Sequence, residues 1–166
     1  MKKHFTYLLA GSNQGDRKNY INYSLELISK KIGTITKKSS YFESQAWNMK
    51  KNTPNFLNRI FRVSTILSPM NLLKMILNIE YLIIKKKKNP KNIFYENRKI
   101  DIDILFYDQL IINSSNLIIP HKLLHFRKFV LFPMCEINPN KLHPIFNMNM
   151  LEILGTCSDI LWVKKI

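Results

Sequence analysis

The segment at residues 98–108, RKIDIDILFYD, constrains the fold of this chain more than any other stretch. Apolar side chains occupy every second position in it: Ile100, Ile102, Ile104 and Phe106. This alternation predicts a β-strand with one buried face. Asp101 and Asp103 lie between the apolar positions, so they share the opposite face of the strand. Because a charged carboxylate is costly to remove from water unless it is paired, this acidic face requires an explanation beyond packing.

Strand and helix patterns alternate along the rest of the chain. Three segments before the acidic strand are typical of strands: residues 4–13, 34–44 and 55–67. Helical spacing of apolar residues predicts one helix that starts at Asp16 and is capped by Gly33, and another that starts at Ser68-Pro69. The resulting order, β-α-β-β-α-β, predicts an α+β fold: a ferredoxin-like βαββαβ sheet with its helices packed on one face, plus C-terminal additions.

Composition indicates one globular domain, which we expect to span residues 1–166. The net charge of +15 favours an anionic partner, but the abundance of Lys, Ile and Asn is also typical of an AT-rich coding sequence. Cys135 and Cys157 lack the spacing of a metal or redox site. No stretch is long enough for an export signal or a membrane span. We therefore expect a cytoplasmic protein that binds no membrane.

The two aspartates of the acidic strand leave two interpretations open. Residues two apart in a strand have Cα atoms roughly 7 Å apart, so the carboxylates of Asp101 and Asp103 can converge on one or two hard cations. The alternative is a solvent-facing pair neutralised by Arg98 and Lys99. The basic segment just upstream, Arg98 itself and two later cationic residues favour a polyphosphate ligand with Mg²⁺. Those later residues are His121 and Arg127. The chain lacks the GxxxxGK[ST] motif of P-loop enzymes.

Several motifs occur in an order and spacing that resemble a known family. They are YLLAGSNQGDR, SSYFES, NFLNRIFRV, IE at residues 79–80, NRKIDIDILFYD, IIPH and FRKFVLFPMCEINP. Together they resemble 6-hydroxymethyl-7,8-dihydropterin pyrophosphokinase over roughly residues 5–140. The resemblance implies transfer of the pyrophosphoryl group of ATP to the hydroxymethyl group of the pterin, with release of AMP, in folate biosynthesis. It also implies two Mg²⁺ ions and a ferredoxin-like fold.

The resemblance implies a role for each charged residue near the acidic strand. Asp101 and Asp103 would hold the Mg²⁺ ions, and with Arg98 and Arg127 they form the expected catalytic set. The expected ATP-binding residues are Lys85, Lys87, Tyr95, Arg98, His121 and Arg127. Lys85 and Lys87 stand where the family has loop arginines, and we expect residues 85–97 to form a lid that orders around ATP. Taken alone, His121 could instead merely turn the chain, and Arg127 could be a surface residue.

The resemblance also implies a pterin site. The expected substrate-binding residues are Ser44, Trp47, Phe56, Asn58 and Phe129. A flat ring with amide-like edges requires aromatic faces and matched hydrogen-bonding groups. Phe56 and Phe129 could equally be ordinary core residues, and Trp47 could simply pack. Asn58 is harder to explain away, because a polar side chain in the middle of a strand requires a partner.

The expected partners are therefore ATP and a reduced pterin, bound by a monomer. One alternative from another functional class is a basic ferredoxin-like module that binds RNA. That alternative explains the positive charge but not the D-x-D pair, which would repel a nucleic-acid backbone, and it would require exposed aromatic side chains on a basic sheet. We expect no nucleic-acid partner.

Overall fold

The computed structural model describes residues 1–85 and 95–166 of the chain. The strands are β1 (His4–Ser12), β2 (Gly33–Lys38), β3 (Phe42–Ser44), β4 (Phe56–Thr65), β5 (Asp101–Tyr107), β6 (Ile112–Asn113), β7 (Ile118–Ile119) and β8 (Val163–Lys165). The helices are α1 (Arg17–Lys31), α2 (Pro69–Ile84), α3 (Lys128–Ile137) and α4 (Met150–Thr156), with a 3₁₀ turn η1 (Leu124–Phe126) before α3. In the part of the chain that the structure describes, no helix is long and apolar enough to cross a membrane.

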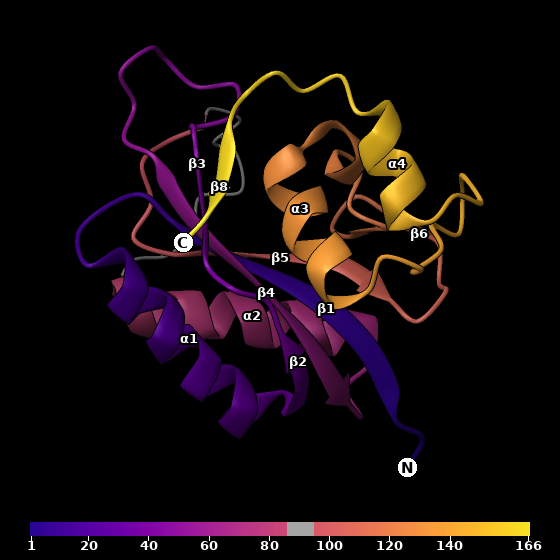
Figure 1. The fold of residues 1–166 in the computed structure, drawn as a ribbon. Helices are drawn as coiled ribbons and strands as arrows, with labels where there is room; N and C mark the ends of the chain where they lie inside the picture. The colour runs from indigo at the N-terminus through magenta and orange to yellow at the C-terminus, as the bar shows by residue number, and fades with distance from the viewer. Residues whose placement is uncertain (86–94) are drawn as a thin grey trace.

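A six-stranded antiparallel sheet forms the centre of the structure, in the order β5-β1-β4-β3-β8, with β2 also paired to β4 (Figure 1). The strands β6 and β7 form a separate hairpin. The predicted strand at residues 34–44 is in fact two strands, β2 and β3. The strand is interrupted between them at Ser39. Ser39 is buried, and its hydroxyl accepts the amide N–H of Ile60 at 2.9 Å. The prediction of a mixed α+β fold is confirmed.

The helices α1 and α2 start where the sequence predicts. The side chain of Asp16 accepts the amide N–H of Asn19 at 3.1 Å, and that of Ser68 accepts the amide N–H of Asn71 at 3.3 Å. The predicted cap at Gly33 is wrong by one residue. The C-cap residue of α1 is Ile32, and Gly33 already begins β2. Glycine is required there for another reason: a Cβ atom at this position would lie 2.0 Å from the carbonyl oxygen of Ser64.

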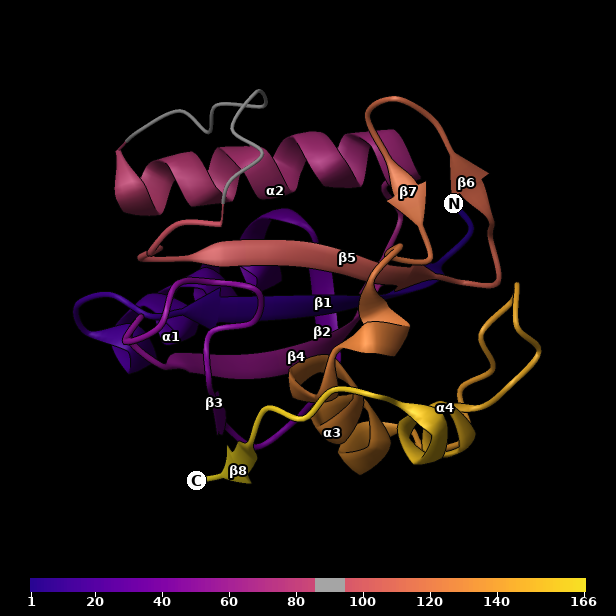
Figure 2. The same ribbon diagram turned by 90° about the horizontal axis from the view of Figure 1, so that it is seen from above.

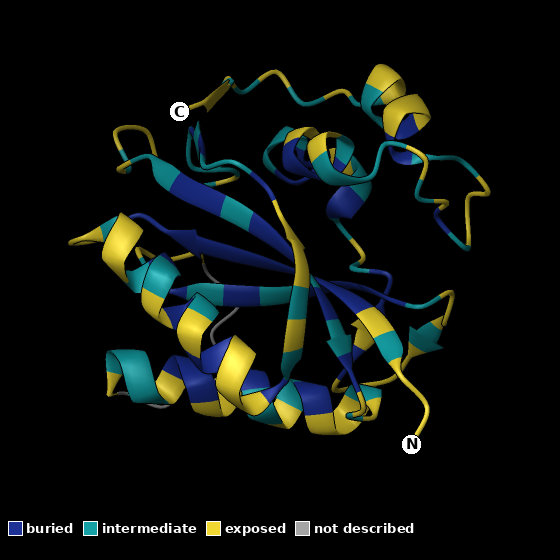
Figure 3. Cartoon of the chain, turned by 60° about the horizontal axis from the view of Figure 1, so that its bottom comes forward, coloured by how far each residue is buried: buried dark blue, intermediate teal, exposed yellow. Residues whose placement is uncertain are grey.

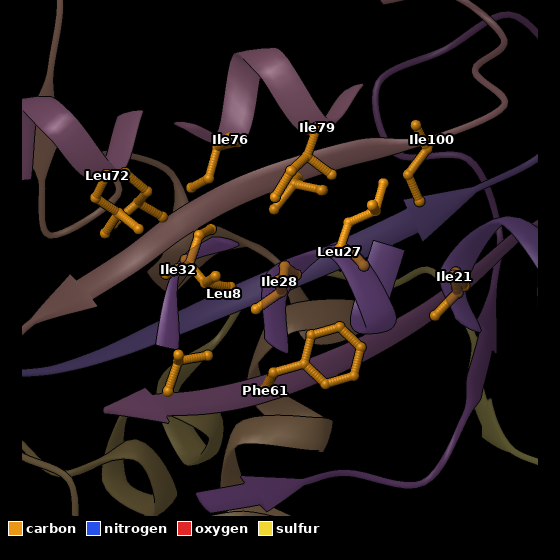
Figure 4. Close-up of a cluster of buried hydrophobic side chains, with 14 of the residues drawn as sticks. Leu8, Ile21, Leu27, Ile28, Ile32, Phe61, Leu72, Ile76, Ile79 and Ile100 are labelled. Atoms are coloured by element: carbon orange, nitrogen blue, oxygen red, sulfur yellow. The ribbon is translucent and has the colours of Figure 1, made fainter. Parts of the chain in front are cut away.

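Both faces of the sheet are covered by helices, as Figures 1 and 2 show. The helices α1 and α2 pack on one face over a core that includes Leu8, Ile28, Phe61, Ile76 and Ile79 (Figure 4). The helices α3 and α4 pack on the other face. Their side chains Leu131, Met134 and Met150 form a core there with Tyr7, Leu9 and Ile60 of the sheet. The prediction of helices on one face therefore holds for α1 and α2 only, because the C-terminal additions bury the second face of the sheet (Figure 3).

The acidic strand β5 follows the predicted alternation for most of its length. Ile100, Ile102 and Ile104 lie in the core under α1 and α2. Phe106 does not: it belongs to the core under α3 and α4. The register between β1 and β5 shifts at Leu105, where Tyr7 pairs with Phe106 and Leu8 with Ile104. This bulge inserts one residue and reverses the side-chain phase after it.

Candidate active site

A cavity of about 220 Å³ opens on the sheet face opposite α1 and α2. It lies where the first half of β5, the central strands β1 and β4, the loop after β3 and the start of α3 meet. Its lining residues are Leu9, Gly11, Ser44, Gln45, Trp47, Met49, Phe56, Asn58, Tyr95, Glu96, Arg98, Asp101, Asp103, His121, Lys122, Leu123, Arg127 and Phe129. The cavity thus brings together nearly all the residues that the sequence singled out.

Asp101 and Asp103 both face this cavity and are half-buried. Arg98, three residues earlier, donates from its guanidinium Nη1 to Oδ2 of Asp101. Burial by itself would lower the pKa of Arg98, but the negative charges of Asp101 and Asp103 outweigh it and hold that pKa above its ordinary value. The acidic face of β5 is therefore directed into a cavity that the positively charged side chain of Arg98 also lines, and not into open solvent.

Two side chains that the sequence analysis did not assign hold this acidic segment in place. The buried side chain of Asn13 accepts the amide N–H of Arg98 at 2.7 Å and donates to Asn97 Oδ1 at 2.9 Å. Glu80 of α2 is 3% exposed, and its Oε1 accepts the amide N–H of Ile102 at 2.7 Å. Ile102 separates the two aspartates, so Glu80 fixes the backbone between them. Both residues fall in motifs of the family resemblance, but nothing in their local pattern indicates these partners.

His121 lines the same cavity as the acidic strand. Its amide donates to the carbonyl of Leu105 at 3.0 Å, which attaches the segment to β5. Burial lowers the pKa of the imidazole below its usual value, and the negative charge of Asp103 only partly opposes this effect. The ring Nδ1 accepts the amide N–H of Leu123 at 3.2 Å. In its neutral form the ring then carries its proton on Nε2, where it can donate a hydrogen bond.

Arg127 is 6% exposed, so the alternative interpretation of this residue as a surface arginine is wrong. Its guanidinium lies 4.6 Å from the ring centre of Trp47, 5.5 Å from that of Phe129 and 5.9 Å from that of Tyr95. Its Nη2 donates to the hydroxyl of Tyr95 at 3.1 Å. Its Nε is buried and forms no hydrogen bond within the described residues. A buried cation with a donor to spare is suited to an anionic ligand.

The polar residues of β3 and β4 form the other end of the cavity. Asn58 is 1% exposed, and its amide nitrogen donates to Ser44 Oγ at 2.9 Å and to the carbonyl of Phe42 at 3.3 Å. These bonds supply the partner that a polar residue in mid-strand requires. A Cβ atom on Gly11 would lie 3.3 Å from Asn58 Oδ1, so the glycine leaves room for this oxygen. Phe56 lines the same end of the cavity.

Of the two lysines expected to bind ATP, only Lys85 lies in the part of the chain that the structure describes. Lys85 is exposed at the C-terminal end of α2, in a left-handed conformation with φ 55°, and it does not line the cavity. Lys87 lies outside the described residues, as do residues 86–94 of the expected lid.

This chain is similar over most of its length to known proteins. The sequence pattern of the family 7,8-dihydro-6-hydroxymethylpterin-pyrophosphokinase (HPPK) matches residues 7–139. The chain is 38% identical over 146 residues to 2-amino-4-hydroxy-6-hydroxymethyldihydropteridine pyrophosphokinase from Aquifex aeolicus, with 88% of each chain covered. It is 40% identical over 134 residues to the bifunctional protein FolKE of Lactococcus lactis, covering 80% of this chain and 37% of that protein.

A solved structure shares the fold. A crystal structure of Plasmodium falciparum HPPK-DHPS superposes with a TM-score of 0.78 at 16% identity, covering 93% of this chain. The chain spans 45% of that solved protein, so the matched region is one part of a longer polypeptide there. These matches do not support the alternative of an RNA-binding module.

Proposed function

This chain belongs to the 6-hydroxymethyl-7,8-dihydropterin pyrophosphokinase family, and from that premise we propose how its cavity performs the family's reaction. The reaction transfers the pyrophosphoryl group of ATP to the hydroxymethyl group of 6-hydroxymethyl-7,8-dihydropterin and releases AMP, a step in folate biosynthesis. The observation that carries the proposal is the convergence, in one cavity, of two carboxylates with the cationic side chains of Arg98 and Arg127 beside several aromatic rings.

We propose that Asp101 and Asp103 hold two Mg²⁺ ions. Their carboxylates share one face of β5 and line the cavity. Mg²⁺ prefers oxygen ligands and is usually held by one or two carboxylates together with substrate phosphates, which fits this donor set. When bound, the ions would neutralise the charge that develops on the phosphates. Arg98, which already contacts Asp101, would then lie beside the same phosphates.

The phosphate chain of ATP would lie between β5 and the start of α3. Arg98, Arg127 and the neutral His121 border this part of the cavity and all present N–H donors. In the reaction, the pterin hydroxyl oxygen attacks the β-phosphorus in line, and the bond from that phosphorus to the bridging oxygen of the α-phosphate breaks. The proton of the hydroxyl group is released to solvent. AMP leaves with the electron pair on its phosphate oxygen. Positioning and charge neutralisation supply most of the catalysis.

The pterin would bind at the end of the cavity formed by β3, β4 and α3. Phe56, Trp47 and Phe129 provide aromatic faces for a flat ring, while Ser44 and Asn58 provide hydrogen-bonding groups at its edge. Tyr95 contacts both Arg127 and Trp47, with its ring centre 6.0 Å from that of Trp47. It would therefore lie at the junction between the two substrates.

We also propose that the framework around this site is ferredoxin-like. The elements β1, α1, β2, β4, α2 and β5 follow one another in the chain, and their strands are arranged β5-β1-β4-β2, which supports that proposal. Because β8 joins the same sheet, we treat residues 1–166 as one pyrophosphokinase domain. The free thiols of Cys135 and Cys157 suit a reducing cytoplasm.

Nucleotide analysis tests the proposed function directly. The purified protein is incubated with ATP, Mg²⁺ and 6-hydroxymethyl-7,8-dihydropterin, and the products are separated by chromatography. We expect AMP and the pterin diphosphate in equal amounts, and loss of turnover when Mg²⁺ is removed with a chelator. ADP as the nucleotide product, or AMP formation that does not depend on the pterin, would contradict the proposal.

A further inference from the structure

The C-terminal tail, residues 157–166, lies outside the residues 7–139 that match the family pattern. From the end of α4 it passes over α3 and reaches β3, where it forms β8 (Figures 1 and 2). This path takes the tail past β3 and α3, two of the elements that form the pterin end of the cavity.

The tail adds a strand beside the one that carries Ser44. Within β8, Val163 pairs with Ser44 and Lys165 with Phe42, in antiparallel register. One residue further along, the side-chain oxygen Oε1 of Gln45 accepts the backbone N–H of Trp162 at 3.0 Å. The backbone N–H of Gln45 in turn donates to the Trp162 carbonyl at 3.4 Å. The strand β3 has only three residues. Pairing with β8 gives it a second neighbouring strand besides β4 and holds the start of the loop that lines the cavity.

The tail also caps the helix that carries Phe129. The residue at the N-cap position of α3 is Arg127, and its side chain forms no capping hydrogen bond. Instead, Oδ2 of Asp159 accepts the amide N–H of Lys128 at 3.0 Å. The other carboxylate oxygen, Oδ1, accepts the amide N–H of Leu161 at 3.0 Å. Asp159 therefore places a negative charge at the positive end of α3 and ties that end to the tail.

Lys128 lies directly between two residues of the proposed site. Its amide is held by Asp159, while the side chains of Arg127 on one side and Phe129 on the other both line the cavity. A rotation of the first turn of α3 would turn the Phe129 ring, whereas the guanidinium of Arg127 is also held by the Tyr95 hydroxyl and lies against the Trp47 ring. The carboxylate of Asp159 is thus well placed to fix the direction in which the Phe129 ring points.

We propose that Asp159 is a positioning residue for pterin binding, and that the tail holds the wall formed by Ser44 and Gln45 at a set distance from the wall formed by Phe129. This inference rests on the proposed function. The acidic strand β5, which carries Asp101 and Asp103, pairs with β1 and not with the tail. Loss of the tail contacts should therefore weaken pterin binding much more than nucleotide binding.

The test compares Asp159→Ala with Asn149→Ala, a change at the N-cap of α4. The Asn149 side chain accepts the amide N–H of Glu152 at 2.8 Å, so this control removes a similar cap away from the cavity. The dissociation constant of the pterin is measured in the presence of saturating Mg²⁺ and a non-hydrolysable ATP analogue, and that of the analogue is measured separately. Thermal unfolding of each variant reports its stability.

We expect Asp159→Ala to raise the pterin dissociation constant about 5-fold, the ratio that corresponds to one lost capping interaction, and to change that of the analogue less than about 2-fold. Asn149→Ala should lower stability and leave pterin binding unchanged. Asp159→Asn retains only one acceptor oxygen, so it should show a smaller loss, and it gives the same comparison if the alanine variant does not fold.

Unchanged pterin binding in a folded Asp159 variant would overturn the inference. An equal loss in Asn149→Ala would also overturn it, because the effect would then follow general stability. In either case, production of AMP and pterin diphosphate by the wild-type protein would leave the proposed function standing. Failure of the wild-type protein to bind the pterin would instead refute the proposed function.

Discussion

Replacing Asp103 by asparagine tests the role of the acidic strand with the smallest possible change. The substitution removes one negative charge and keeps the size of a half-buried side chain that lines the cavity. The apolar face of β5 is unaffected, because Ile102 and Ile104 remain buried in the core under α1 and α2. We therefore expect the variant to fold normally.

The expected loss of activity follows from the position of this charge. In the proposed site Asp103 would bind the metal ions together with Asp101, and Asp101 is already paired with Arg98. Loss of one preorganised electrostatic group at a reacting centre typically costs on the order of 10²–10³ in rate, or about 3–4 kcal/mol. Asp103 is also the strongest charge opposing the fall in the pKa of His121 that burial causes. The same substitution should therefore lower the pKa of His121 further.

Initial rates of AMP formation at saturating ATP and pterin, over a range of Mg²⁺ concentrations, measure the first effect. Titration of the His121 ring by NMR measures the second. Asp108→Asn is the matched control: Asp108 directly follows β5, but it contacts His4 and the amide of Phe5 outside the cavity. This control should lose stability and keep its turnover. Retention of more than about a tenth of wild-type turnover by Asp103→Asn, or an equal loss of turnover in the control, would contradict the proposed role of Asp103.

Three other perturbations address the pterin wall, the pH dependence of stability and the sheet. Phe129→Ala removes a stacking face worth about 1 kcal/mol beyond its buried area, so the pterin dissociation constant should rise far more than that of an ATP analogue; equal losses would make Phe129 a core residue only. Burial, helped by His125 and Lys141, lowers the pKa of His143 to about 4. The unfolded chain therefore takes up a proton near pH 6.5 that the folded chain accepts only near pH 4. As the pH is lowered from 6.5 to 4, the free energy of unfolding should fall by up to about 3 kcal/mol. Urea unfolding should show a smaller fall in His143→Gln, and an identical fall would contradict this. Gly33→Ala should destabilise by about 2–3 kcal/mol, because its Cβ would lie 2.0 Å from the Ser64 carbonyl oxygen. Gly155→Ala, with open space around it, should be neutral or stabilising in thermal unfolding, and equal behaviour of the two variants would be inconsistent with this explanation.

The sequence alone was sufficient for features that depend on near neighbours in the chain. The alternation in residues 98–104 predicts both the buried face of β5 and the acidic face that lines the cavity. The caps at Asp16 and Ser68 lie within three residues of the amides that they accept. The family motifs identified the reaction, because each pairs a residue type with a fixed local spacing.

Other features depended on segments that are far apart in the sequence. The bulge at Leu105 exists because β1 pairs with β5 about a hundred residues away, and it moves Phe106 to the other core. The guanidinium of Arg127 packs against Trp47 and Tyr95, which come from two distant loops. The cap on α3 comes from Asp159, 31 residues beyond Lys128. Periodicity reports which face of an element is apolar, but it does not report which distant segment will cover that face or supply a partner for its polar atoms. Those choices are made by packing and hydrogen bonding in the folded chain.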